Sequence, residues 1–521
     1  MRVHDYLDYH AREHPEADFA VQGERRLTYR QAVAEANRVA NAFVSAGLRA
    51  GDRVAILSKN SIEYCILYYG AFKAGVVLVP LNYRLAPTEW AYIINDAQAK
   101  MLIAAGQYVD AADAVRSELR TVEGLVAVNA AAPAGWADYG QWVADRPATT
   151  PDRLIKDDDD IYQMYTSGTT GRPKGAVLTH SAVDANIAQF TVVWKPEPGQ
   201  RGLIVAPVYH AATAITVFLC VSWGFCLYIQ EDFNPGEVVR ALSEENIAAT
   251  TLVPSMIQAC LVAVPDVAER RYDNLSRISY GASPIAEETL KRAIETFKCD
   301  FGQGYGMTET TAILSYLYPE DHRRALTEKP ELLLSAGRPL VGTEARVVDE
   351  DDNPVPNGVI GEIVARGPQL MRGYWNLPDE SAEALRGGWF HTGDAGMMDD
   401  EGYIYIQDRV KDMIVSGGEN IYPRVIEDVL FQHPAIADAA VIGVPDEQWG
   451  ETVKAIVVLR QGATATEEEI IDFCRGKLGG FERPRSVAFV EELPRNPTGK
   501  VLKRELREPY WAGHGRRVAG A

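Results

Sequence analysis

Residues 165–175 have the sequence YTSGTTGRPKG and follow an aromatic and apolar run, IYQMY at 161–165, that predicts a strand. Three glycines let the backbone take positive φ and approach a ligand closely: Gly168, Gly171 and Gly175. The segment also offers the hydroxyl groups of four Ser and Thr residues and the ammonium of a lysine: Thr166, Ser167, Thr169, Thr170 and Lys174. Such groups suit the terminal phosphates of a nucleotide. The segment is not a Walker A loop, because no Gly-Lys-Ser/Thr closes it.

The net charge argues against one class of partner. Lys and Arg total 52 and Asp and Glu total 72, which gives −20, whereas a nucleic-acid binder normally shows a basic face. We therefore expect no nucleic-acid partner, and an anion such as ATP must be held by local positive charge. The six cysteines and nine histidines are scattered, without C-x-x-C pairs or His clusters. This pattern argues against a disulfide framework or a zinc site and favours a cytoplasmic protein.

The length of the chain, 521 residues, predicts two or more domains. In the first half, helix-like apolar spacings alternate with short β-branched runs. This alternation predicts layered α/β sheets with helices on their faces, which bind ligands at the carboxyl ends of their strands. Helices are expected at 27–46 and 61–74, and strands at 54–57, 76–80, 100–104, 204–207 and 248–253.

The uncharged run at 211–229 (AATAITVFLCVSWGFCLYI) is long enough in principle to span a bilayer. Ser, Thr and Gly interrupt it, and Glu231 and Asp232 follow at once. A buried helix leading into a buried strand is therefore the better interpretation. We expect no transmembrane segment, while peripheral membrane contact stays open.

From about residue 337 the sequence changes to short strands separated by turn chemistry such as Asp-Asn-Pro and Pro-Asn-Gly. This change predicts a small β-rich subdomain at about 337–407. Beyond it, a helix from about Arg424, strands at 439–443 and 454–459, and a helix at 467–478 predict a small α+β domain.

Four further motifs follow in order: GYGMTET at 304–310, WFHTGD at 389–394, DRVKDMIVSGGENIYP at 408–423 and PRNPTGK at 494–500. With YTSGTTGRPKG they resemble the adenylate-forming superfamily of acyl-CoA synthetases, aryl-CoA ligases, firefly-type luciferases and peptide-synthetase adenylation domains. The resemblance covers nearly the whole chain. It implies an N-terminal AMP-binding domain at 1–407, a mobile C-terminal domain at 408–521 with its hinge near Lys411, and ATP, Mg²⁺ and coenzyme A as cofactors.

The resemblance also implies the nucleotide site. Tyr305 would pack against adenine, Thr308 would contact phosphate, and Glu309 would hold Mg²⁺, which often binds one carboxylate together with ATP oxygens and waters. Two residues would serve the ribose side, Asp394 and Arg409. Further contacts are implied for Thr166, Ser167, Gly168, Thr169, Thr170, Gly171, Lys174, Gly281, Ala282, Ser283 and Gly306. Many family members have Ala at the position of Ser283.

Two lysines and a glycine pair carry the implied catalytic cycle. Lys500 matches the family's adenylation lysine, which supplies positive charge as the carboxylate attacks the α-phosphate. By family analogy the C-terminal domain then rotates about Lys411 and brings in a coenzyme A channel, whose glycines leave room for the narrow pantetheine. The channel residues are Ser416, Gly417, Gly418 and Glu419.

His210 occupies the family position beside the substrate carboxylate. Spacing alone favours a core residue, but its Pro-x-Tyr-His context favours the site. The implied acyl pocket is small-sided or apolar: Tyr209, His210, Ala211, Ala212, Thr213, Ala312 and Ile313. Little positive charge lies there, which disfavours an amino acid or a dicarboxylate as substrate.

The leading hypothesis is an ATP-dependent acid–thiol ligase that forms acyl-CoA through an acyl-adenylate and releases pyrophosphate and AMP. A medium- or long-chain fatty acid fits, and a cinnamate-, ferulate- or benzoate-type acid fits nearly as well, because hydrophobic pockets discriminate weakly. Two alternatives stay open: a ligase that loads a carrier protein, and a nucleotide-binding module without catalysis. A homodimer would be unsurprising.

Overall fold

The computed structural model of the chain describes residues 1–166, 172–194, 196–281, 285–409, 412–416, 419–446, 448–475, 477–495 and 501–512, with the backbone alone at 408, 409, 419 and 420. Two compact units are present: Met1–Ala345 with Ala365–Phe390, and Arg346–Val364 with His391–Ala521. The expected fold class, layered α/β sheets in a larger N-terminal part with a smaller C-terminal part, is confirmed. The β-rich strands fall partly in each unit, and the boundary expected at 407/408 stays a prediction.

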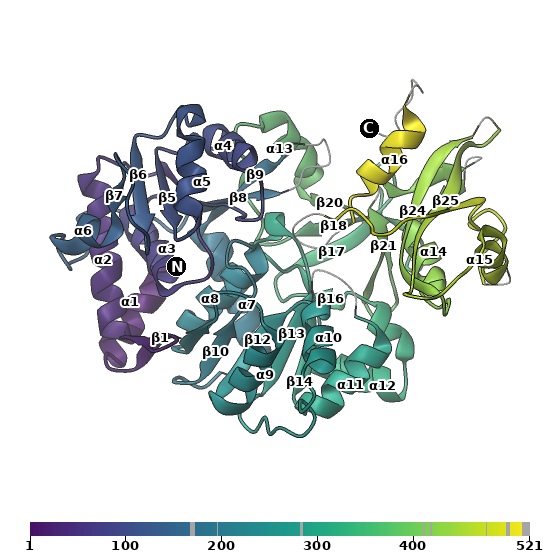
Figure 1. The fold of residues 1–521 in the computed structure, drawn as a ribbon, viewed down its shortest axis with the longest axis horizontal. Coiled ribbons are helices and arrows are strands. Elements are labelled where there is room, and N and C mark those ends of the chain that lie inside the picture. The colour runs from purple at the N-terminus through teal and green to yellow at the C-terminus, as the bar shows by residue number, and fades with distance from the viewer. Residues whose placement is uncertain are drawn as a thin grey trace. The chain divides into compact units, whose positions relative to one another are not determined.

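The larger unit contains a nine-stranded sheet in the order β16-β15-β14-β13-β12-β10-β11-β1-β2 (Figure 1). Its strands are β1 Asp18–Gln22, β2 Arg25–Thr28, β10 Arg201–Ile204, β11 Cys226–Ile229, β12 Ile247–Leu252, β13 Arg277–Gly281, β14 Asp300–Tyr305, β15 Ser315–Leu317 and β16 Arg338–Pro339. Strands β10 to β14 and β1 pair in parallel, while β15 pairs with β14 antiparallel. The carboxyl ends of β10, β12, β13 and β14 therefore lie at one edge.

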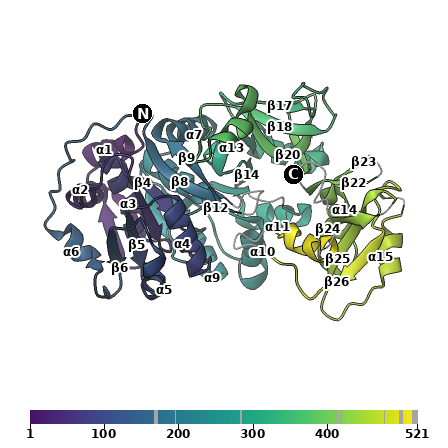
Figure 2. The ribbon, with the colours of Figure 1, turned by 90° about the horizontal axis from the view of Figure 1, so that it is seen from above.

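A second, eight-stranded sheet of the same unit has the order β19-β9-β8-β4-β3-β5-β6-β7 (Figure 2). Its strands are β3 Arg53–Leu57, β4 Val77–Pro80, β5 Met101–Ala105, β6 Gly124–Val128, β7 Ala137–Asp138, β8 Asp160–Thr166, β9 Lys174–Thr179 and β19 Gly373–Tyr374. Strand β9 lies antiparallel to both β8 and β19. This pairing brings residues about two hundred positions apart in the chain side by side.

Helix α3 (Ile62–Ala74) packs between the two sheets, because it contacts β4 of one and β1 of the other. All of its residues are buried, as expected for a helix that is covered on every side. Ser61 caps its first turn by accepting from the backbone N–H of Tyr64, and Gly75 ends it with a φ of 70°. Helices α7 and α8 pack beside each other, with α7 on β9 and α8 on β10, β11 and β12.

Besides α3, the described part of this unit contains further α-helices and short 3₁₀ helices that connect its strands. They are α1 His4–Glu13, α2 Tyr29–Ser45, α4 Pro87–Asp96, α5 Tyr108–Ala114, α6 Tyr139–Ala144, α7 His180–Val193, α8 Ala211–Ser222, α9 Pro235–Glu244, α10 Pro254–Ala263, α11 Glu287–Phe297, α12 Pro319–Thr327 and α13 Pro378–Ala384, with the short 3₁₀ helices η1 Arg116–Glu118, η2 Thr308–Thr310, η3 Pro330–Leu334 and η4 Arg386–Gly388.

The predicted elements agree with the structure except at a few boundaries. The helix expected from residue 27 begins at Tyr29, because Arg25–Thr28 forms β2. The strand expected at 204–207 is wrong, since β10 ends at Ile204 and the next two carbonyls accept from the side chain of Asn60. The uncharged run at 211–229 forms α8 and β11 as expected. Within the described ranges, no helix is long and apolar enough to cross a membrane.

The second unit holds most of a four-stranded sheet, β17-β18-β20-β21, and a sheet of β23-β22-β25-β24 with β26 beside β25. These strands are β17 Glu344–Val348, β18 Gly361–Arg366, β20 Phe390–Met398, β21 Ile404–Arg409, β22 Ile414–Ser416, β23 Glu419–Ile421, β24 Ile436–Asp446, β25 Gly450–Leu459 and β26 Ser486–Phe489, with helices α14 Pro423–Leu430, α15 Glu467–Phe473 and α16 Lys503–Trp511. Alternate residues of β24 enter two cores, Val441 on one face and Ile442 on the other.

Two buried histidines tie the first helix to the core of the larger unit. The rings of His4 and His180 meet edge to face at 5.4 Å, and the backbone N–H of Val3 donates to Nδ1 of His180. Burial lowers the pKa of His4 to about 3, with the ammonium of Lys73 adding to the effect. Burial also lowers the pKa of His180 to about 2, and His4 adds to this shift. Both rings are therefore neutral at neutral pH.

These shifts predict that stability falls as the pH drops below about 6.5, the pKa of an unfolded histidine. Between that value and the low native pKa values only the unfolded chain takes up these protons, so each histidine costs about 1.4 kcal/mol per pH unit. At pH 5.5 the pair should lower the free energy of unfolding by roughly 2–3 kcal/mol. Denaturant unfolding at pH 7.5 and 5.5 measures this loss. His180→Gln should show a smaller loss than the wild type, whereas a control His14→Gln, at an exposed position, should not.

Candidate active site

The predicted adenine and acyl residues meet at the carboxyl edge of the nine-stranded sheet. Gly281 ends β13 and Tyr305 ends β14. Leu314, just before β15, donates its N–H to the carbonyl of Tyr305 over 2.7 Å, which brings the neighbouring Ala312 and Ile313 to the same edge. Tyr209 and His210 follow β10, whose carboxyl end lies there too. Parallel α/β sheets bind ligands at this edge.

The glycines of this edge are required by the packing of its own loops. A Cβ on Gly281 would lie 2.5 Å from the carbonyl oxygen of Gly304, and one on Gly306 would lie 2.3 Å from that of Ala312. The prediction that Gly175 takes positive φ is wrong. Gly175 lies within β9 with ordinary φ, and a Cβ there would meet Gln163 at 2.7 Å. Its small size accommodates a neighbouring strand.

The GYGMTET segment ends in a sharp turn at Thr311, two residues after its acidic residue. Thr308 is half-buried and Glu309 is buried in η2, and Thr311 follows with a φ of 65°. A β-branched residue rarely takes this conformation, so the turn is strained. The Thr311 hydroxyl donates to the carbonyl of Gln369 over 2.6 Å, and the N–H of Met371 donates to the carbonyl of Glu309 over 2.7 Å. Residues 369–371 therefore hold the turn.

Lys174 and Glu309 converge on a third side chain, Tyr374. The Tyr374 hydroxyl donates to Oε1 of Glu309 over 2.9 Å, and Nζ of Lys174 lies 5.3 Å from the centroid of the Tyr374 ring. A cation above an aromatic face is attracted to it. The sequence motifs do not include Tyr374. It lies in GYW at 373–375, which carries no formal charge at neutral pH and belongs to none of the quoted motifs.

The residues around Glu309 fit Mg²⁺ held mainly by a nucleotide. No group of three or more His, Cys, Asp or Glu side chains that could hold a metal occurs in the described part of the chain. One buried carboxylate, with one oxygen held by a tyrosine, is the kind of partial site at which Mg²⁺ keeps waters and binds phosphate oxygens.

The first residue of the phosphate segment has a structural role. The Tyr165 hydroxyl donates to Asp96 over 2.6 Å and accepts from Gln163, and burial raises its pKa. Thr166 is half-buried at the end of β8, opposite Lys174 in the β8–β9 pairing. The hairpin thus brings the two ends of the phosphate segment together, with Lys174 beside Thr166. Ser167, Gly168, Thr169, Thr170 and Gly171 lie outside the described residues, as do Ala282 and Ser283.

A buried asparagine shapes the loop that carries Tyr209 and His210. Asn60 donates to the carbonyl of Ala206 over 2.9 Å and accepts from the N–H of Val208 over 2.9 Å. His210 is the N-cap residue of α8, half-buried, with its ring 4.2 Å from that of Tyr209. The amino end of α8, where the helix dipole is positive, suits a carboxylate beside His210. Sequence motifs gave no sign of Asn60.

The expected acyl walls differ in exposure. Ala211, Thr213 and Ala312 are buried, Ile313 is half-buried and Ala212 is exposed. Tyr209 is buried, its hydroxyl has no hydrogen-bond partner within the described residues, and burial raises its pKa. A buried hydroxyl without a partner is costly, so this atom favours a ligand that offers an acceptor.

Four predicted residues of the second unit lie in described strand pairs. Asp394, which is buried, stands opposite Arg409 in the β20–β21 pairing. The two ribose-side residues of the resemblance are therefore direct neighbours along the backbone ladder. Ser416 pairs with Glu419 in the β22–β23 hairpin. Lys411, Gly417, Gly418 and Lys500 lie outside the described residues.

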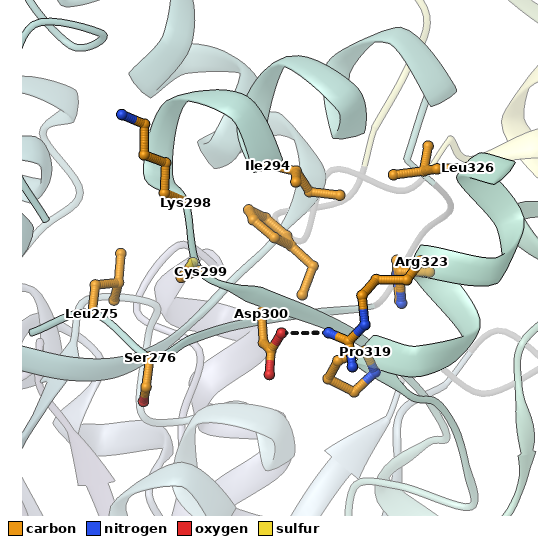
Figure 3. Close-up of a pocket in the computed structure, with 11 residues that line it drawn as sticks. Leu275, Ser276, Ile294, Lys298, Cys299, Asp300, Pro319, Arg323 and Leu326 are labelled. Carbon is orange, nitrogen blue, oxygen red and sulfur yellow. Dashed lines mark hydrogen bonds and ion pairs between the residues drawn. The ribbon is translucent and has the colours of Figure 1, made fainter. Parts of the chain in front are cut away.

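The cavity drawn in Figure 3 lies at the opposite edge of the nine-stranded sheet, at the amino ends of β13 and β14, with a volume of about 440 Å³. Its lining includes Ser276 and Asp300, and an ion pair of 2.8 Å joins Asp300 to Arg323 beside it. None of the predicted site residues contributes to it. The cavity is therefore separate from the candidate active site.

The close packing around Gly306 predicts that Gly306→Ala destabilises the site. The new Cβ would overlap backbone atoms, which cannot shift cheaply, so we expect a loss of about 1–3 kcal/mol in the free energy of unfolding and weaker ATP binding. Thermal unfolding and ATP titration measure both effects. Gly140→Ala is the matched control, because a Cβ there meets only a side-chain oxygen of Asp138 at 3.2 Å. Equal behaviour of the two variants would contradict this packing argument.

Comparison with known families and proteins matches this chain almost throughout. Residues 7–375 match the model of a family described as AMP-binding enzyme, and residues 425–500 match that of the AMP-binding enzyme C-terminal domain. A fatty acid–[acyl-carrier-protein] ligase of Streptomyces coeruleorubidus is 35% identical over 98% of this chain and 96% of its own. A feruloyl-CoA synthase of an Amycolatopsis species is 38% identical over 96% and 97%. The solved structure of a Mycobacterium tuberculosis fatty acyl CoA synthetase is 35% identical, covers 98% of both chains and has a TM-score of 0.80.

Proposed function

Because the chain belongs to the AMP-binding enzyme family and is an ATP-dependent acid–thiol ligase of it, we propose that it joins a medium- or long-chain fatty acid to coenzyme A. The reaction runs through an acyl-adenylate and releases pyrophosphate and then AMP. The observation that carries the nucleotide half of this proposal is the convergence of Lys174 and Glu309 on Tyr374. Tyr374 thus connects the YTSGTTGRPKG motif, to which the resemblance assigns phosphate binding, with the GYGMTET motif, to which it assigns the metal ion.

The proposed roles of the nucleotide-binding residues follow from the chemistry of their side chains. Lys174 attracts the terminal phosphates against the net charge of −20. Glu309 and Thr308 face the same ligand, Tyr305 offers an aromatic face for the base, and Asp394 offers two acceptors for the ribose hydroxyls. The loop of 166–171, with Gly281 to Ser283, completes the ATP site, and Arg409 completes the ribose side.

Glu309 is the proposed Mg²⁺ residue. When bound, the ion would neutralise phosphate charge and stabilise the charge that develops as pyrophosphate leaves. The single carboxylate, buried and oriented by Tyr374, supports this assignment. Because Tyr374 holds the Glu309 carboxylate in one orientation, little reorganisation is needed during the reaction.

The acyl half of the site rests on an apolar environment. Tyr209, Ala211 and Ala312 are buried and uncharged, which supports a hydrocarbon substrate, with His210 and the amino end of α8 beside its carboxylate. Ala212, Thr213 and Ile313 are the remaining proposed walls. The solved M. tuberculosis fatty acyl CoA synthetase supports this choice.

The thiol half of the reaction uses the second unit. Lys500 is proposed to place an ammonium at the α-phosphate during adenylation, where it stabilises the developing charge. After pyrophosphate leaves, rotation about Lys411 would replace it with Ser416, Gly417, Gly418 and Glu419 as the coenzyme A channel. The β22–β23 hairpin supports a narrow channel here, because Ser416 pairs directly with Glu419 and only the two glycines connect them.

Two other substrates have specific support. The buried hydroxyl of Tyr209, which has no hydrogen-bond partner among the described residues, favours an aryl acid with an oxygen substituent, as does the similar feruloyl-CoA synthase. The similar carrier-protein ligase favours a protein-bound pantetheine as acceptor. All six cysteines are free, which supports the cytoplasm as the compartment. We also propose a homodimer, and light scattering would measure this oligomeric state.

A panel of acids tests the substrate. Fatty acids from butyrate to stearate, benzoate, cinnamate and ferulate are each supplied with ATP, Mg²⁺ and coenzyme A, and AMP release is followed. The proposal expects the highest kcat/KM for a fatty acid, with no effect of Tyr209→Phe on it. If ferulate is the better substrate and Tyr209→Phe lowers its kcat/KM about tenfold, the aryl alternative replaces the fatty acid.

Separate assays of the two half-reactions test the alternating use of the second unit. Lys500→Ala should slow adenylate formation by about a hundredfold or more and leave thioester formation from supplied acyl-AMP nearly intact. Gly418→Trp should do the reverse, because a bulky side chain would fill the channel. Equal loss of both half-reactions in both variants would overturn the assignment of Lys500 and the glycine pair to different steps.

A further inference from the structure

Tyr374 contacts both charged side chains of the candidate phosphate site. Its hydroxyl donates to Oε1 of Glu309 over 2.9 Å, and its ring faces Nζ of Lys174 at 5.3 Å. We propose that Tyr374 is a positioning residue that fixes the Glu309 carboxylate for the metal ion and holds the Lys174 ammonium at the phosphates. The inference rests on the proposed function, because it assigns a task within that site.

The backbone of Tyr374 is fixed by strand pairing. Tyr374 stands opposite Ala176 and Gly373 opposite Val177 in the β19–β9 pair, and Trp375 donates its N–H to the carbonyl of Gly175 over 2.8 Å. Since β9 begins at Lys174, this register places Tyr374 close to that lysine. A slip of one residue would turn Tyr374 to the other face of the strand.

The residues after β19 anchor it further. The N–H of Tyr374 donates to the hydroxyl of Ser381 over 2.8 Å. The indole of Trp375 donates to the carbonyl of Asp96 over 3.1 Å, and the guanidinium of Arg53 stacks 3.3 Å from the Trp375 ring. Tyr374 is therefore held through its own backbone and through Trp375, so its side chain can orient other groups.

The same segment holds the Glu309 turn. Met371 donates to the Glu309 carbonyl and Gln369 accepts from the hydroxyl of the strained Thr311. Residues 369–375 thus fix the backbone of Glu309 at one end and its carboxylate at the other. These contacts to both the backbone and the carboxylate of Glu309 favour a role in orienting the carboxylate.

The chemistry of this arrangement favours metal binding. A phenol that donates to one carboxylate oxygen makes a charge-assisted hydrogen bond and selects one rotamer. This bond occupies Oε1 of Glu309, so in the proposal the other carboxylate oxygen binds the cation. The ring face attracts the ammonium of Lys174 without neutralising it, so the full positive charge is kept for phosphate.

Tyr374→Phe isolates the hydroxyl, because the ring beneath Lys174 remains. Binding of Mn²⁺ with ATP to the full-length protein, followed by electron paramagnetic resonance, should weaken by about five- to tenfold. The KM for the metal–nucleotide should rise by a similar factor while kcat at saturation changes less than twofold. The control Tyr29→Phe removes another buried hydroxyl bond, to the carbonyl of Phe225 at 2.7 Å, and should leave Mn²⁺ binding unchanged.

A double-mutant cycle shows whether Tyr374 acts through Glu309. Glu309→Gln removes the charge, so adding Tyr374→Phe to it should cost less than twofold more in Mn²⁺–ATP binding. Additive losses, or wild-type binding in Tyr374→Phe, would overturn the proposal. The measurement needs no carboxylic acid. A wild type that binds Mn²⁺–ATP but activates no acid would therefore refute the proposed function and leave this inference standing.

Discussion

The antiparallel pairing of β19 with β9 is the contact on which the candidate site depends. It sets Tyr374 beside the strand that Lys174 begins, and the residues just before it hold the turn of Glu309. Three residues distant in the chain thereby form one cluster. Because side chains alternate between the two faces of a strand, a slip of one residue would turn Tyr374 away from Glu309. The register of this pairing therefore decides whether the tyrosine contacts the carboxylate. The backbone pairing of β19 with β9 thus determines how the charges of Lys174 and Glu309 are arranged.

The two sheets divide the work of the larger unit. The eight-stranded sheet supplies Lys174 through the β8–β9 hairpin, and the nine-stranded sheet supplies the edge with Gly281, Tyr305 and the loop of His210. Helix α3, buried along its whole length, packs between them, and its Tyr68 donates to the carbonyl of Val208 over 2.9 Å. The core and the acyl loop are therefore coupled: a side chain of the central helix supports the segment that would meet the acid.

The sequence was most informative where local chemistry decides the structure. Ser61 and Gly75 mark the ends of α3, and the uncharged run at 211–229 divides into α8 and β11 as expected. It failed where distant groups decide. The strand expected at 204–207 ends early because Asn60 takes its carbonyls, and Gly175 is small to fit Gln163. The sequence motifs did not identify Tyr374, because its contacts with Lys174 and Glu309 depend on the pairing of β19 with β9. The motifs identified Glu309 and Lys174, but only the fold shows what joins them.

Exchange of labelled pyrophosphate into ATP shows whether Lys174, Tyr374 and Glu309 form the triphosphate site of an acid-activating enzyme. We expect exchange that requires a carboxylic acid, needs no coenzyme A, and falls by about a hundredfold in Glu309→Gln. Exchange without any acid, or at the wild-type rate in Glu309→Gln, would contradict it.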